Sequence, residues 1–133
     1  MGNIDINFKP SVDVFDANVS LGRRHNRRVR IDSVDATIEV MDQSGVGKAL
    51  TYSAHAADFD SRDGNDLLME MIKGQPRLVP QFVCNPAFDD FDSFSSQVAD
   101  LKIRSVRMLP QLHNYPFKDW ILEHWLEWLT EEN

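Results

Sequence analysis

Arginines are concentrated in one short segment. Residues 23–30 read Arg-Arg-His-Asn-Arg-Arg-Val-Arg and hold five of the 14 basic residues of a chain whose formal net charge is −7. Guanidinium groups bind carboxylates and phosphates through paired hydrogen bonds, so Arg23 and Arg24 are candidates for holding a small carboxylate or phosphate ligand. The alternative is a solvated loop whose arginines pair with the chain's many acids. The sequence leaves both interpretations open.

Two histidines, His55 and His113, are candidates for acid–base catalysis. Each follows a segment with strand character, and an imidazole with an ordinary pKa near 6.5 can give or accept a proton around neutral pH. A hydrogen-bonded structural role is the alternative for both residues. The sequence places His25 and His124 on the surface.

The single cysteine, Cys84, excludes an internal disulfide and a cysteine-based zinc site. It lies between Phe-Val and Asn-Pro with no neighbouring base, which predicts a small buried apolar residue.

Length and composition indicate one globular domain spanning residues 1–133, since 42% of the residues are hydrophobic. The acidic balance argues against nucleic-acid binding, which requires an excess of Lys and Arg. No apolar run approaches the roughly 18 residues that a membrane span needs, and the first residues do not resemble a secretory signal. We therefore expect a cytoplasmic protein with no membrane partner.

Short β-rich runs alternate with helical segments along the chain. Apolar residues recur at helical spacing from Val34, with Asp32 as a candidate N-cap and Gly45 as the end of that helix; Asp89 and Asp90 are candidate caps of a later one. This pattern predicts strands at 12–17, 48–52, 78–83 and 105–109, and helices around 34–41, 67–72, 91–101 and 121–129. Four consecutive βα units indicate an α/β fold with a parallel sheet.

The first of these units carries a resemblance to a known family. Residues 15–22 read Phe-Asp-Ala-Asn-Val-Ser-Leu-Gly, which resembles the opening of the amidohydrolase superfamily, in its amidohydrolase-related branch of metal-dependent hydrolases. There the first strand ends in Asp-x-His-x-His-x-Gly, and the two histidines bind a divalent metal such as zinc. Further similar segments follow in order at 41–49, 64–68, 76–80, 85–86 and 107–115. The resemblance implies the amino-terminal half of a TIM (β/α)8 barrel.

Two departures limit what the resemblance implies about function. Asn18 and Ser20 stand where the family has its metal-binding histidines, and an amide and a hydroxyl are poor zinc ligands beside imidazole. A complete barrel also needs roughly 250 residues. We therefore expect no metal and no cofactor in this chain, and no activity from it alone: hydrolase or decarboxylase activity would belong to a full-length barrel. Asn18 and Ser20 remain candidate substrate contacts, together with Arg23 and Arg24.

The alternative is a non-catalytic, self-associating α/β module or a small-anion-binding domain. Half a barrel leaves two strand edges and one sheet face open, and both features favour association between chains. We therefore expect a homo-oligomer, with Trp120 and Trp128 of the last helix as candidate interface residues.

Overall fold

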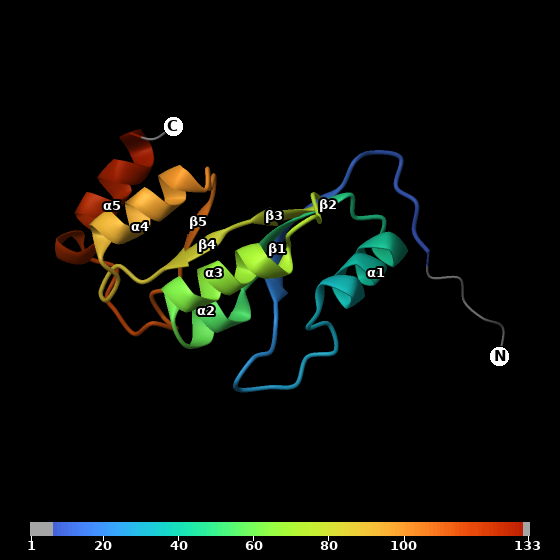
Figure 1. Cartoon of the computed structure of the whole chain (residues 1–133), viewed down its shortest axis with the longest axis horizontal. Helices are drawn as coiled ribbons and strands as arrows, with labels where there is room; N and C mark the ends of the chain where they lie inside the picture. The colour runs from blue at the N-terminus through green and yellow to red at the C-terminus, as the bar shows by residue number, and fades with distance from the viewer. Residues whose placement is uncertain (1–6, 132–133) are drawn as a thin grey trace.

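The computed structural model describes residues 7–131 and shows a mixed α/β chain with parallel strands. The predicted fold class is confirmed at this level. Strands β1–β3 lie side by side at the centre of Figure 1, α2 and α3 lie in front of them, and α4 and α5 lie together beside β4 and β5. In chain order the elements are β1 (Phe15–Leu21), α1 (Val34–Ser44), β2 (Lys48–Ser53), α2 (Ala54–Asp58), α3 (Ser61–Met71), β3 (Leu78–Pro80), β4 (Phe82–Cys84), α4 (Phe91–Asp100), β5 (Val106–Met108) and α5 (Asp119–Glu131).

The strands form two small parallel sheets where the sequence predicted one. The first has the order β1-β2-β3 and the second pairs β4 with β5. Only Gln81 separates β3 from β4, and its N–H donates to the carbonyl of Thr51 in β2 over 2.8 Å. The next amide, that of Phe82, donates to Ser105 beside β5 over 3.0 Å. The predicted strand 78–83 is thus two strands, because its first half pairs with β2 and its second half with β5.

Strand β1 lies further along the chain than predicted. It spans Phe15–Leu21 and not 12–17, and its last residue pairs with Ser53 at the end of β2. Val19 and Leu21 turn towards the core, and Leu21 is almost fully buried. Asn18 and Ser20 therefore lie within the strand, whose pairing with β2 shifts register between Asp16 and Val19.

Helix ends follow the capping residues closely. Gly45 ends α1 with a φ of 70°, as predicted, while the N-cap of that helix is Ser33 and not Asp32. Asp90 caps α4 as predicted, its carboxylate accepting from the N–H of Ser93. The short helix α2 was not predicted; the hydroxyl of Ser53 starts it by accepting a hydrogen bond from the N–H of Ala56.

The core lies between the strands and the helices. Phe82 and Cys84 of β4 are completely buried against α4, whose Phe94 ring lies 5.4 Å from the ring of Trp125 in α5. The other core side chains come from β1, β2, β3, α1 and α3 and from the segments that follow α3 and α4: Leu21, Met41, Ala49, Leu68, Ile72, Leu78 and Ile103.

The opposite face of the strands is more polar. The guanidinium of Arg107 lies 4.3 Å above the ring of Tyr52, and its Nε donates to the Gln81 side chain over 2.6 Å. Gln81 in turn donates to the hydroxyl of Ser105 over 2.7 Å. This network links the two sheets across the point where β3 becomes β4.

Within residues 7–131, no helix combines the length and the apolar character needed to cross a bilayer.

Candidate functional site

The loops that follow the strands meet around a cavity of about 330 Å³, here called the carboxyl-end pocket. His25 lies beyond the end of β1, Asp58 ends the helix that follows β2, Asn85 follows β4 and His113 follows β5. Carboxyl ends of parallel strands are where ligand sites form in α/β folds. The remaining lining residues are Ala56, Ala57, Phe59, Asp60, Ser61, Phe88 and Leu112.

A buried carboxylate holds the arginine segment against this pocket. The Asp58 side chain has no exposed surface, and its Oδ2 lies 3.0 Å from Nε of Arg24 and 3.2 Å from Nδ1 of His25. The backbone N–H of His25 donates to the same oxygen over 3.3 Å. The charge of Arg24 is therefore balanced by Asp58, so Arg24 is not a free cation for an anionic ligand. The second oxygen, Oδ1, has no hydrogen-bond partner in the described part of the chain.

The position of the His113 ring fixes which nitrogen carries its proton. Nε2 lies 2.9 Å from the carbonyl oxygen of Ala57. A carbonyl can only accept, so Nε2 is protonated and donates. In the neutral ring Nδ1 then carries a lone pair, and this buried nitrogen has no hydrogen-bond partner among residues 7–131. His113 is thus presented as a hydrogen-bond acceptor.

Asp89 fixes the loop after β4. Its carboxylate accepts from the backbone N–H of Asn85 over 2.7 Å and from the hydroxyl of Ser61, the first residue of α3. Cys84 lies next to this loop. Burial is the main cause that raises the pKa of its thiol, and the negative charge of Asp89 is the second cause. Burial is also the main cause that raises the pKa of Tyr115 to about 12. Cys84 and Tyr115 are therefore neutral groups that pack beneath the loop.

Apolar side chains surround the mouth of the carboxyl-end pocket. Phe59, Phe88 and Leu112 are 65%, 79% and 42% exposed, which is unusual for residues of this size. The ring of His55 lies 5.2 Å from the ring of Phe59 but does not line the pocket. Of the two histidines proposed for acid–base chemistry, only His113 lies at this site.

The other residues singled out in the sequence lie elsewhere. Asn18 and Ser20 line a second hollow, of about 540 Å³, between β1, α1 and the arginine segment; we call it the β1-edge hollow. Arg23 is almost fully exposed, and its Nε lies 3.3 Å from a carboxylate oxygen of Asp32. Asn18 and Ser20 are thus together, but apart from Arg23, Arg24 and the two histidines.

Sequence reasoning missed Asp58 and Asn85. His25 is exposed, as predicted, and its Nδ1 lies 3.2 Å from Oδ2 of Asp58. The signal for Asp58 was weak, because a single aspartate at the end of an alanine-rich stretch is common. Asn85 was visible only as part of an Asn-Pro turn.

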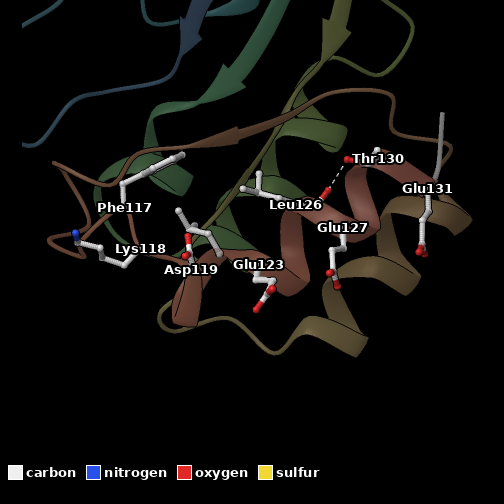
Figure 2. Close-up of a pocket in the computed structure, with 9 residues that line it drawn as sticks. Phe117, Lys118, Asp119, Glu123, Leu126, Glu127, Thr130 and Glu131 are labelled. Carbon is white, nitrogen blue, oxygen red and sulfur yellow. Dashed lines mark hydrogen bonds between the residues drawn. The ribbon is translucent and has the colours of Figure 1, made fainter.

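A third hollow of about 520 Å³ runs along α5 (Figure 2). Figure 2 shows the carboxylates of Glu123, Glu127 and Glu131 on the same side of the helix. This arrangement follows from the four-residue spacing of the three glutamates, since residues four apart share a helix face.

The prediction that Trp120 and Trp128 form an interface is not tested by this geometry. Trp120 is 76% exposed, and Trp128 is partly buried against the core.

The two positions that hold the metal in the resembling family do not fit a metal here. Asn18 is exposed on an edge strand and its neighbour Ser20 offers only a hydroxyl. Within residues 7–131, no three His, Cys, Asp or Glu side chains are grouped so that they could hold an ion. We derive no metal chemistry for this site, and the metal-free state remains a prediction.

None of the family models, curated proteins or solved structures compared with the chain matches it.

Proposed function

We propose that this chain is an amidohydrolase-like α/β domain, corresponding to the amino-terminal half of a barrel, which binds a small molecule at the carboxyl-end pocket without a metal. The order of parallel strands supports this proposal, because β2 pairs with β1, β3 with β2 and β5 with β4. The observation that carries it is the convergence of the loops after β1, β2, β4 and β5 on one cavity.

The lining of the pocket indicates the class of ligand. Asp58 Oδ1 and His113 Nδ1 are both acceptors without a donor among the described residues. A buried acceptor left without a partner costs about 1–3 kcal/mol, so a ligand that supplies N–H or O–H donors would recover part of this cost. The exposed Phe59 and Phe88 rings at the mouth add an apolar surface. A small amide or amine with a compact apolar body fits both features.

The chemistry that these residues support is binding and proton acceptance. His113 Nδ1 can accept a proton from a bound donor, while its Nε2–H remains on the Ala57 carbonyl. The Asp58 carboxylate is held by Arg24 and His25, and its Oδ1 is an acceptor without a partner among the described residues. We propose no hydrolysis by this half-barrel alone.

A ligand screen with two matched variants tests the proposal. Small amides and primary amines carrying a phenyl or short alkyl group should give saturable chemical-shift changes at residues of the pocket. His113→Ala should weaken binding about tenfold, the value of one hydrogen bond. His55→Ala removes a neighbouring histidine outside the pocket and should leave affinity unchanged. Equal affinity of wild type and His113→Ala would contradict the assignment.

A self-associating module is the second candidate function. Within residues 7–131, β1 and β5 each pair with a strand on one side only, and open parallel edges favour pairing between chains. We propose a homodimer or larger assembly on this basis. Light scattering at micromolar concentration tests it, and a well-folded monomer would count against it.

A further inference from the structure

The β1-edge hollow brings together two arginines that have no acidic partner. Arg27 and Arg30 both line it, and neither makes an ion pair with any residue of the described range. Asp16 is the acid among the lining residues, and its carboxylate already accepts from the backbone N–H of Asn18 over 2.9 Å. The ionisable groups around the hollow therefore sum to one positive charge, which suits a single anionic group.

Two neutral polar side chains lie beside these arginines. Asn18 and Ser20 both belong to β1, and both line the hollow. Neither side chain makes a hydrogen bond with another residue in the range 7–131 that the structure describes. An amide and a hydroxyl next to two guanidinium groups form a set of donors for carboxylate oxygens.

The rest of the hollow is apolar. Ile31 and Val40 are 38% and 36% exposed, which leaves aliphatic surface open beside the arginines. The other apolar lining residues are Val19, Val29, Met41 and Val46. A volume of about 540 Å³ lies within the range of small-molecule sites. The anion that fits is therefore one that carries an apolar body.

We propose that the β1-edge hollow binds an aliphatic monocarboxylate, with its carboxylate between Arg27 and Arg30 and its alkyl chain along Ile31 and Val40. A carboxylate matches the single net charge of the hollow better than a phosphate dianion does. The site shares no lining residue with the carboxyl-end pocket, so it stands or falls independently of the function proposed for that pocket.

Titration calorimetry on the intact chain tests the ligand class. Acetate, butanoate, hexanoate and octanoate should bind with increasing affinity, by up to about fourfold for each methylene buried. Inorganic phosphate should bind more weakly than octanoate, and octanoate binding should weaken as salt is raised from 0.05 to 0.5 M. Phosphate binding as tight as that of octanoate, with no dependence on chain length, would overturn the proposal.

The arginine segment itself supplies the matched control. Arg27→Gln and Arg30→Gln should each weaken octanoate binding at least tenfold, as expected for the loss of one charge-assisted hydrogen bond. Arg28→Gln removes the same charge from an exposed neighbour that does not line the hollow, and should change the affinity less than twofold. Equal losses in all three variants would reveal only a diffuse positive field and would refute the site. Val40→Ser should flatten the chain-length dependence while leaving acetate binding unchanged, and an unchanged dependence would contradict the placement of the alkyl chain.

Discussion

The side chain of Asn65 takes the place of a neighbouring strand beside β4. Its Nδ2 donates to the carbonyl of Val83 over 2.8 Å, and its Oδ1 accepts from the N–H of Val83 over 3.0 Å. Both residues are completely buried. Asn65 therefore joins α3 to β4, the strand that leads to Asn85 and the carboxyl-end pocket.

Replacement of Asn65 by alanine removes both hydrogen bonds and leaves the buried N–H and C=O of Val83 without partners. Each buried group left in this way costs about 1–3 kcal/mol, so the combined loss of unfolding free energy should be about 3 kcal/mol after local relaxation. A domain of this size has a total stability of about 5–15 kcal/mol. Asn65→Ala should therefore fold, but with a much smaller margin.

Urea denaturation followed by tryptophan fluorescence measures this loss, because Trp125 is buried in the same core. With a slope of about 2 kcal/mol per molar urea, the midpoint should fall by about 1.5 M. Gln97→Ala is the control: it removes an exposed bond to Asp66 and should cost less than about 0.5 kcal/mol.

A second substitution separates the two bonds. Asn65→Asp keeps an acceptor for the Val83 N–H but places a carboxylate oxygen against the Val83 carbonyl. This variant should be as unstable as Asn65→Ala at pH 7 and should regain stability relative to wild type near pH 4, where a protonated carboxyl can donate. A loss below 1 kcal/mol for Asn65→Ala, or no recovery of Asn65→Asp in acid, would refute the reasoning.

Three further predictions follow from other packed groups. A Cβ on Gly64 would lie 2.1 Å from the backbone nitrogen of Ala56, so Gly64→Ala should push α2 away from α3 and lower the free energy of unfolding, measured with urea, by at least about 2 kcal/mol. Gly47→Ala is the control, because a Cβ there makes only an ordinary contact, and it should cost less than about 1 kcal/mol. Equal losses in the two variants would contradict the close approach of α2 to α3. The pKa of Tyr115 is about 12 in the folded chain and about 10 when unfolded. The unfolded state therefore loses the Tyr115 proton first, and the free energy of unfolding should fall as pH rises from 10 to 12. Tyr115→Phe should remove the contribution of Tyr115 to this fall. Burial raises the pKa of the Cys84 thiol. A thiol-specific reagent at pH 8 should therefore react with the native protein at least a hundredfold more slowly than with the urea-unfolded chain. Rapid labelling of the native protein would show that the thiol is accessible.

The local features of the fold could be predicted where one residue type has one dominant role. Gly45 ends a helix because a left-handed conformation is easy for glycine, and Asp90 starts one because its carboxylate accepts a backbone hydrogen bond. Cys84 is buried, as its apolar surroundings indicated. The short helix α2 escaped prediction because its five residues are too few to show a periodic pattern.

The candidate site could be predicted only in part, because its geometry depends on contacts between distant residues. His113 acquires a defined proton position from the carbonyl of Ala57, 56 residues away. Asp58 matters because it is buried against Arg24, and that ion pair depends on how the arginine segment folds back. The sequence shows the residue types, whereas these pairings follow from tertiary packing.

The order of the strands has a consequence for synthesis on the ribosome. In the first sheet β2 pairs with β1 and β3 with β2, and in the second sheet β5 pairs with β4. Paired strands are therefore close to one another in the sequence. The three-stranded sheet can form once Pro80 has emerged, and β5 needs only β4, which precedes it by about 20 residues. Helix α5, which packs on α4, is then the last element to dock. Nascent chains arrested just after Pro80 has left the ribosome should therefore already protect the amides of β2 from exchange, before the aromatic cluster around Trp125 exists.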